Sequence, residues 1–265
     1  MSIDSLFVSN PAPETVRAEG FPAAAHPSEA ELFCRQEAMP GHDQRLLEEA
    51  HVGVIGCGGL GSWVALALAR MGVRRLTLVD PDRFDRTNAP RQFVMPKDLG
   101  EFKALALARN VAAHMTNSGH ITAICRSAQD ALDPGEMSPS ALFVGVDNNA
   151  ARLFASDYAR RNRIPAIFCM LSVDGLRAQA FSQLPNGPCL LCVLPNLDVR
   201  SAAPCAAASV ASCFLAAAHA VAMVEDAVMS AGNPALPSWR ETSLDGSTER
   251  TGAPLHRKFC QCRPG

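Results

Sequence analysis

Residues 51–80, HVGVIGCGGLGSWVALALARMGVRRLTLVD, decide the fold of this chain of 265 residues. The run HVGVIG is apolar and ends at glycines, which predicts a buried parallel strand. The helical pattern SWVALALARMGV follows at once, and RLTLVD predicts a second strand. A strand, a helix and a strand in this order form a βαβ unit, so we expect a parallel sheet.

The same alternation continues along the chain and predicts a Rossmann-like, doubly wound α/β domain with a mainly parallel sheet. Apolar runs predict further strands at residues 121–126, 141–147, 165–173 and 176–184. Helical patterns occupy residues 101–115 and 149–162, and a long alanine-rich helix is expected to begin at Cys205. A tract rich in proline, glycine and serine, residues 232–254, then leads to a short tail that carries cysteines.

Composition and charge argue against some classes of protein. A net charge of −2 is unfavourable for broad electrostatic binding to nucleic acid or to an anionic membrane. The N-terminal residues MSIDSLFVSNPAPETV have neither a basic region nor a continuous apolar region, so we expect no signal peptide and a cytoplasmic protein. Residues 202–224 are apolar but rich in alanine, which favours a buried helix over a membrane span.

The glycine-rich loop after the first strand predicts a phosphate-binding turn. Gly56, Gly58 and Gly61 form the pattern G-x-G-x-x-G, and Gly59 adds a fourth glycine. Glycines permit a tight turn and a close approach of backbone to ligand, and the N-terminus of the next helix offers N–H donors to a phosphate. Asp80 ends the next strand, where its carboxylate can accept hydrogen bonds from ribose hydroxyls. These features alone fit NAD and ATP equally well.

The next segment separates the two nucleotides. VDPDRFDRTNAPRQF, residues 79–93, contains Asn88, Arg91 and Gln92. A dehydrogenase has no need of this arginine. An enzyme that splits ATP between its α- and β-phosphates needs cations and amides to bind the triphosphate and stabilise the leaving pyrophosphate. The segment therefore favours ATP.

Three more charged residues extend the pattern. Asp82 follows Asp80 by two positions, and Lys103 begins the next predicted helix, where it can add a cation. Asp147 ends the predicted strand ALFVGVD, and a carboxylate at that edge of a sheet can hold Mg²⁺ beside phosphates. Taken singly, each residue has an ordinary interpretation as a turn, capping or surface residue. In this order they favour a nucleotide site.

The combined pattern resembles that of the ubiquitin-activating-enzyme-like adenylyltransferase family, which includes the adenylyltransferases of thiamine and molybdopterin biosynthesis and the activating enzymes for ubiquitin and its relatives. The family pattern is G-x-G-G-x-G, then D-x-D, N-x-x-R-Q, a lysine and D-N, and this chain has each part in that order. The resemblance runs from about residue 31 to the C-terminus. It implies a single ATP-binding adenylation domain, residues 29–265. Residues 1–28 are rich in alanine, proline and glutamate with no clear period, so we expect a flexible arm there.

The segment LFCRQEAMPGHDQRLLEEA, residues 32–50, resembles the entry segment of that family, in which an aromatic residue is followed by x-Arg-Gln. The resemblance implies that Arg35 reaches from one subunit into the ATP site of the other and that the protein is a homodimer. From its position alone, Arg35 would be a solvated or helix-capping residue.

Two pairs of cysteines predict a zinc knuckle in a C-terminal extension of the domain. Cys189 and Cys192 form C-x-x-C, and Cys260 and Cys262 form C-x-C. Four thiolates suit a closed, tetrahedral Zn²⁺ site, and the family often ties its tail back in this way. The usual second pair is C-x-x-C, so the narrower C-x-C is a departure, and His256 is a spare donor. The alternatives are four free thiols or a redox pair at the C-x-x-C. The elements concerned are residues 186–193 and 255–265.

Cys205 is a candidate nucleophile. A thiol at the start of a helix has a lowered pKa, and the segment resembles the compact activating enzyme for ubiquitin-fold modifier, whose cysteine at the matching place takes the modifier as a thioester. The alternative is a small buried residue. We expect the remaining cysteines to be mainly structural: Cys34, Cys57, Cys125, Cys169 and Cys213.

The resemblance implies an enzyme that uses ATP and Mg²⁺ to adenylate the C-terminal glycine of a ubiquitin-like protein, with or without a following thioester and a conjugating enzyme. One alternative is an adenylyltransferase for a sulfur-carrier protein of thiamine or molybdopterin biosynthesis. Others are a peptide-adenylating enzyme of antibiotic biosynthesis, a catalytically silent dimer partner and an NAD-dependent oxidoreductase. The implied catalytic residues are Arg35, Arg91, Lys103, Asp147 and Cys205, and the implied nucleotide-binding residues are Gly56, Gly58, Gly59, Gly61, Asp80, Asp82, Asn88 and Gln92.

Overall fold

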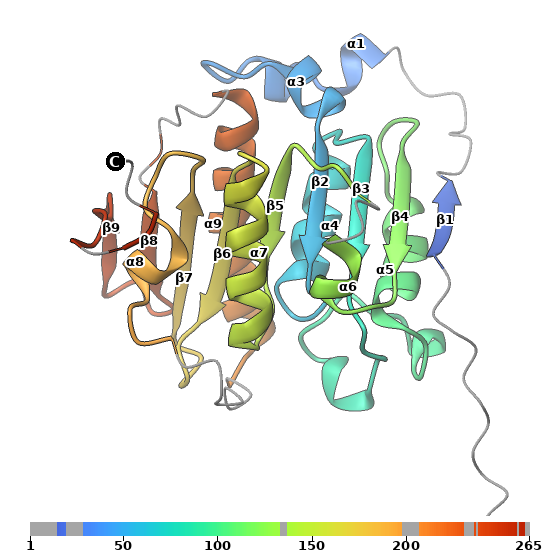
Figure 1. Ribbon diagram of the computed structural model, residues 1–265. Coiled ribbons are helices and arrows are strands. Elements are labelled where there is room, and N and C mark those ends of the chain that lie inside the picture. Colours follow the sequence, from blue (N-terminus) through green and yellow to red (C-terminus); the bar gives the residue numbers. More distant parts are fainter. Residues whose placement is uncertain are drawn as a thin grey trace, which may run out of the picture.

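A computed structural model describes residues 15–19, 29–132, 137–197, 207–230, 236, 238–258 and 260–262. Within these residues, nine strands form one sheet in the order β1-β4-β3-β2-β5-β6-β7-β8-β9 (Figure 1).

The centre of the sheet is parallel and consists of β2 (His51–Ile55), β3 (Arg75–Val79), β4 (His120–Ile124), β5 (Ala141–Val144) and β6 (Ala166–Leu171). Strand β2 pairs with β3 on one side and with β5 on the other, so the direction of strand order reverses there. This is the switch point of a doubly wound sheet, where the carboxyl ends of the strands open a crevice for ligands. The predicted Rossmann-like α/β fold is confirmed for this centre.

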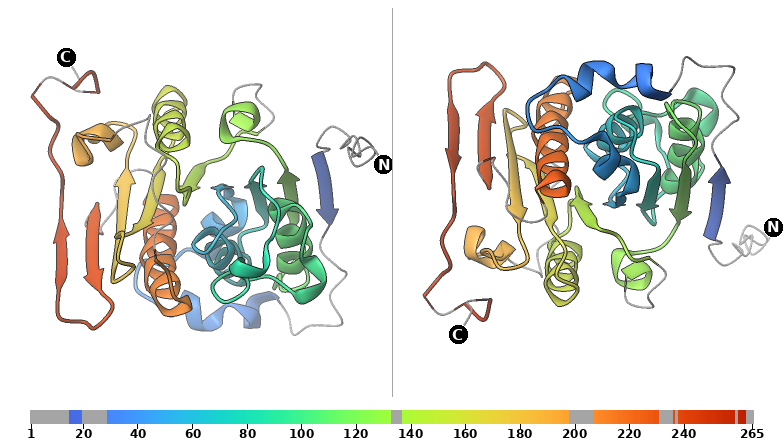
Figure 2. Two further views of the ribbon diagram at one scale, coloured as in Figure 1. Left: turned by 90° about the horizontal axis from the view of Figure 1, so that it is seen from below. Right: turned by 90° about the horizontal axis from the view of Figure 1, so that it is seen from above.

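Helices cover both faces of the sheet (Figure 2). One face carries α4 (Gly61–Arg70), α5 (Lys103–Ala112) and α9 (Val210–Met229). The other face carries α6 (Ala128–Leu132), α7 (Asn149–Arg161) and α8 (Leu190–Val193). Because both faces are covered, the central strands are buried on both sides, which explains their nearly continuous apolar sequences.

Helix α9 is the predicted alanine-rich helix, but it begins later than expected. Ser209 accepts a hydrogen bond from the N–H of Ser212, and Ser212 accepts one from the N–H of Ser209, so this capping box starts the helix at Val210. The prediction that the helix starts at Cys205 is therefore wrong, and Cys205 itself lies outside the described residues.

By length and composition alone, α9 would be long and apolar enough to cross a membrane, and it is the one such helix in the part of the chain that the structure describes. In this fold it packs against β5, β6, β7 and α4, and residues such as Ala216, Ala220 and Met223 are buried in the core.

Antiparallel strands extend the sheet at both edges. Beyond β6 lie β7 (Arg177–Gln183), β8 (Trp239–Ser243) and β9 (Glu249–Gly252), and beyond β4 lies β1 (Thr15–Glu19). The sequence predicts β7 but misses β8 and β9, and it assigns residues 15–19 to a flexible arm. Edge strands are held by main-chain hydrogen bonds to a neighbour and need no continuous apolar run. Residues 15–19 of the expected arm thus pair with β4 as β1.

Short helices complete the described chain. At the amino end of β2 lie α1 (Glu29–Leu32), α2 (Cys34–Glu37) and α3 (Gln44–Glu49). Between β3 and α5 lie two 3₁₀ helices, η1 (Arg86–Asn88) and η2 (Pro96–Asp98). The α1–α3 segment and the η1–η2 segment are therefore at opposite ends of the central strands, because one precedes β2 and the other follows β3.

Candidate nucleotide site and cysteine cluster

A cavity of about 540 Å³ opens at the carboxyl ends of β2, β3 and β5. Its volume lies within the ordinary range for small-molecule sites, roughly 300–1,000 Å³. The walls include most of the residues that the sequence predicts for a nucleotide site: Gly56, Gly58, Gly59, Asp80, Asp82, Asn88, Arg91, Gln92, Lys103 and Asp147. These residues are spread over about ninety positions of the chain, and the parallel sheet brings them to one edge.

The glycine loop joins β2 to α4 and forms the floor of this cavity. Gly56 has a φ of +93°, a conformation that side chains disfavour. Gly61 does not line the cavity; instead, a side chain there would collide with the carbonyl oxygen of Gly56. Gly61 therefore permits the turn, whereas Gly56, Gly58 and Gly59 face the space where a ligand would lie.

Asp80 is buried at the end of β3 and is tied to the glycine loop. One carboxylate oxygen accepts a hydrogen bond from the N–H of Cys57 over 2.7 Å, and the other accepts one from the N–H of Asp82 over 2.9 Å. Burial raises the pKa of the Asp80 carboxyl above its ordinary value, although nearby Lys103 and the two N–H donors act in the opposite direction. Asp80 thus has the fixed orientation expected of a residue that accepts hydrogen bonds from ribose hydroxyls.

Arg91 and Gln92 lie on the turn after η1. The side chain of Asn88 accepts a hydrogen bond from the N–H of Asp85, and the backbone carbonyl of Asn88 accepts hydrogen bonds from the N–H groups of Arg91 and Gln92. Gln92 is buried and lines the cavity, and its side-chain oxygen has no hydrogen-bond partner among the residues that the structure describes. A buried polar atom normally has a partner, so this amide is available to a ligand.

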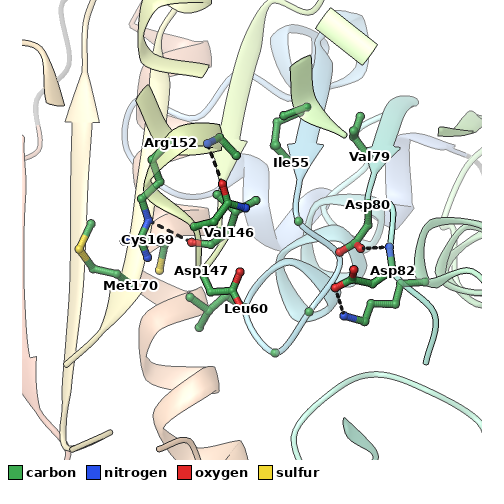
Figure 3. Close-up of a pocket in the computed structure, with 18 of the residues that line it drawn as sticks. Ile55, Leu60, Val79, Asp80, Asp82, Val146, Asp147, Arg152, Cys169 and Met170 are labelled. Atoms are coloured by element: carbon green, nitrogen blue, oxygen red, sulfur yellow. Dashed lines mark hydrogen bonds and ion pairs between the residues drawn. The ribbon is translucent and has the colours of Figure 1, made fainter. Parts of the chain in front are cut away.

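The opposite wall of the cavity carries Asp147 and Arg152, across the glycine loop from Asp80 and Asp82 (Figure 3). Strand β5 ends at Val144, so Asp147 lies on the loop after the strand. Its side chain is exposed, and the cap of α7 is Asn148, whose side chain accepts the N–H of Ala151 over 2.8 Å. Asp147 is therefore not needed as a helix cap.

Arg152, Cys169 and Cys213 are among the cavity residues that the sequence does not predict. Arg152 donates to the carbonyl of Val146 over 3.0 Å and to the side chain of Asn149, and burial lowers its pKa. Cys169 and Cys213 are buried in the cavity wall, and burial raises the pKa of the Cys169 thiol to about 12. The only signal for Arg152 is its place five residues after Asp147 on the first turns of α7. The two cysteines have the apolar neighbours of ordinary core residues.

Arg35 is not part of the cavity of its own chain. It is exposed on α2, in the α1–α3 segment, which lies beyond the amino ends of the central strands (Figure 1). The cavity lies at their carboxyl ends. A contribution of Arg35 to a nucleotide site would therefore have to be made to another subunit, as the sequence analysis expects.

Four cysteines meet where the C-terminal tail reaches the start of α8. The sulfur of Cys189 lies 4.0 Å from that of Cys192 and 3.5 Å from that of Cys260, and the sulfurs of Cys192 and Cys262 are 3.4 Å apart. All four sulfurs lie within 4.8 Å of one another. Zinc–sulfur bonds of about 2.3 Å in a tetrahedron require sulfurs about 3.8 Å apart. The C-x-C pair therefore completes a cluster that fits Zn²⁺, and His256 lies beside it, 3.3 Å from the sulfur of Cys262.

Residues 33–262 match the model of the ThiF family, which is most of the chain. The chain belongs to the ThiF family. This confirms the predicted resemblance.

Curated relatives carry several different names. The chain is 32% identical over 132 residues to a tRNA threonylcarbamoyladenosine dehydratase of Escherichia coli. The matched stretch covers 46% of this chain and 47% of that protein. It is 32% identical over 157 residues to an adenylyltransferase and sulfurtransferase, MOCS3, of Caenorhabditis briggsae. This second match covers 58% of this chain and 38% of that protein. The chain thus spans about half or less of the length of these two relatives.

Solved structures show the same fold. The structure of Escherichia coli MccB with AMPCPP and MccA superimposes with a TM-score of 0.75 at 19% identity, covering 89% of this chain and 75% of that one. A crystal structure of PaaA superimposes with a TM-score of 0.69 at 21% identity, covering 88% of this chain and 86% of that one.

Proposed function

We propose that this chain uses ATP to adenylate the C-terminal carboxylate of a small protein that ends in glycine. The observation that carries the proposal is the cavity, which combines a glycine loop and a ribose-type carboxylate, Asp80, with two cations, Arg91 and Lys103. A hydride-transfer enzyme needs the first two features but not the cations. Family membership and the adenylyltransferase names of several relatives support the same reaction.

In the proposed reaction, a carboxylate oxygen of the acceptor attacks the α-phosphorus of ATP. The bond between the α-phosphorus and its bridging oxygen breaks, and pyrophosphate leaves with the electron pair. The carboxylate is already ionised, so no general base is needed. Arg91 and Lys103 stabilise the charge that develops on the pyrophosphate, and the glycine loop orients the phosphates.

Two metal ions belong to the proposal. Asp147 presents an exposed carboxylate to the cavity, and carboxylate oxygens are the ligands that Mg²⁺ takes. When bound there, Mg²⁺ would supply positive charge beside the phosphates. The four cysteines would hold a structural Zn²⁺ that fixes the C-terminal tail to α8. We further propose that Arg35 completes the site of a second subunit in a homodimer.

ATP–pyrophosphate exchange tests the proposal. The acceptors are small ubiquitin-like and sulfur-carrier proteins that end in Gly-Gly, each compared with a copy that lacks the last glycine, and tRNA is included because some relatives are named for it. Exchange that requires the terminal glycine supports the proposal. Exchange with tRNA alone, or thermal stabilisation by NAD but not by ATP with Mg²⁺, contradicts it.

A further inference from the structure

Two side chains of α4 are bonded to the turn that carries Arg91. The hydroxyl of Ser62, which is buried, accepts a hydrogen bond from the backbone N–H of Phe93 over 3.0 Å. The indole N–H of Trp63 donates to the backbone carbonyl of Arg91, also over 3.0 Å. Ser62 and Trp63 directly follow Gly61, the last glycine of the loop. The two bonds therefore link the glycine loop to the residues on either side of Gln92.

Aromatic packing holds the indole in this position. The ring of Trp63 lies 5.5 Å from that of Phe93 and 4.6 Å from that of Phe214 on α9, in an edge-to-face arrangement with the latter. Such pairs restrict both distance and orientation. Trp63 is thus fixed by α9 on one side and by the arginine turn on the other.

The side chain of Arg91 is held by the same assembly. A side chain at Gly59 would meet the Cγ and Cδ atoms of Arg91 at 3.7 Å, so the arginine stem runs along the glycine loop. Its guanidinium donates to the carbonyl of Thr87 over 2.7 Å. The backbone of Arg91 is therefore fixed by Trp63 while its side chain lies beside the loop expected to hold phosphates.

We propose that Ser62 and Trp63 are positioning residues that hold Arg91 and Gln92 against the glycine loop, so that these side chains meet the triphosphate without a rearrangement of their backbone. This inference rests on the proposed function, because it assigns Arg91 to the phosphates of ATP. A group that is already oriented gives the transition state more stabilisation than a mobile one. Neither Ser62 nor Trp63 needs to touch the nucleotide.

A double-mutant cycle tests the inference. Trp63→Phe keeps an aromatic ring but removes the N–H donor, and Ser62→Ala removes the acceptor. We expect each to lower kcat/KM for ATP in pyrophosphate exchange about tenfold. In an Arg91→Ala background, Trp63→Phe should cause a clearly smaller loss, because only its effect on Gln92 remains and residues that act through one another are not additive. A full tenfold loss in that background, or no loss on Arg91→Ala alone, overturns the inference. Trp239→Phe, in β8, is the matched control and should leave exchange unchanged.

Fluorescence separates this inference from the proposed function. The chain has two tryptophans, so Trp239→Phe leaves Trp63 as the one reporter. The inference requires no rearrangement of the turn, so ATP with Mg²⁺ should raise the melting temperature and leave the Trp63 emission unchanged. Unchanged emission with ATP bound but without exchange would refute adenylation and keep the inference. A shift of the emission when ATP binds overturns the inference.

Discussion

The ammonium nitrogen of Lys103 lies 2.8 Å from a carboxylate oxygen of Asp82, and the charge of buried Asp80 acts on the same ammonium. Burial alone would lower the pKa of Lys103, but Asp80 and Asp82 more than offset it, so the pKa of this side chain is raised. Lys103 therefore remains a cation at neutral pH. In return it lowers the pKa of Asp80, whose own burial raises it.

Replacing this cation should make stability depend on pH. In Lys103→Met, the burial of Asp80 is no longer opposed, so the pKa of Asp80 rises further above its ordinary value of 3.8. A carboxyl group with a raised pKa in the folded state destabilises that state when it is ionised, and acidification relieves the effect. We expect the loss of melting temperature in Lys103→Met to be smaller at about pH 5 than at about pH 7.5.

The control for this prediction is the double variant Lys103→Met with Asp80→Asn. It has no carboxyl at position 80, so the difference between its melting temperatures at the two pH values should follow that of the wild-type protein. If the melting temperature of Lys103→Met alone falls by the same amount at both pH values, Lys103 does not govern the ionisation of Asp80.

Asp147→Asn should abolish exchange without unfolding the protein. The amide is nearly the same size but is a weaker ligand for Mg²⁺, so we expect a loss of about 100-fold or more. The side chain is exposed, so the free energy of unfolding should change by less than about 0.5 kcal/mol. Asp157→Asn is the matched control, because Asp157 is exposed on α7 and pairs with Arg161 over 3.0 Å. Unchanged exchange in Asp147→Asn would remove Asp147 from the site.

Purified protein should contain about one Zn²⁺ per chain, measured by inductively coupled plasma mass spectrometry. Cys260→Ser removes one thiolate and should lose the metal and lower the melting temperature, because the tail is then no longer tied to α8. Cys34→Ser is the control, since Cys34 is an exposed thiol outside the cluster. If wild-type protein contains no metal and a chelator does not change its melting temperature, the four cysteines are ordinary thiols and the zinc site is refuted.

The sequence predicts the parallel centre and most of the cavity because both depend on short-range patterns. Apolar runs mark the buried strands, and the polar residues of the site lie just after them. β8, with the sequence WRETS, and β9, with ERTG, have no apolar alternation. Their placement depends on main-chain pairing and on side-chain contacts such as that of Arg250 with Glu241 over 3.5 Å. The start of α9 is missed because its capping box uses Ser212 in place of the usual Glu or Gln.

A long-range contact can be predicted only where a residue pattern identifies both partners. The two cysteine pairs provide such a pattern, and the sulfurs of Cys192 and Cys262, seventy positions apart, lie 3.4 Å from each other. The bond between Trp63 and Arg91, which are twenty-eight positions apart, has no such pattern. Arg152 lies on a helix whose many charged residues suggest exposure, so its half-buried place in the cavity depends on the packing of α7.

The proposal that Cys205 is a nucleophile needs a different physical reason. Because α9 starts at Val210, the dipole of that helix no longer explains a reactive thiol at this position. The remaining reason is sequence proximity: Cys205 precedes Ala208, a residue of the cavity wall, by three positions. We predict that ATP, Mg²⁺ and the glycine-ended acceptor yield an adduct that reducing agents cleave, and that Cys205→Ser abolishes it.

Two matched variants decide which thiol carries this adduct. Cys205→Ser should still catalyse pyrophosphate exchange, because the residues proposed to bind ATP lie elsewhere, so its loss of adduct reports thiol transfer alone. Cys213→Ser should keep the adduct, because burial raises the pKa of the Cys213 thiol and disfavours the nucleophilic thiolate, although Arg91 opposes this. An adduct that survives Cys205→Ser but disappears in Cys213→Ser would place the nucleophile inside the cavity. With no adduct in the wild-type protein, the adenylate itself would be the product handed to the next reaction.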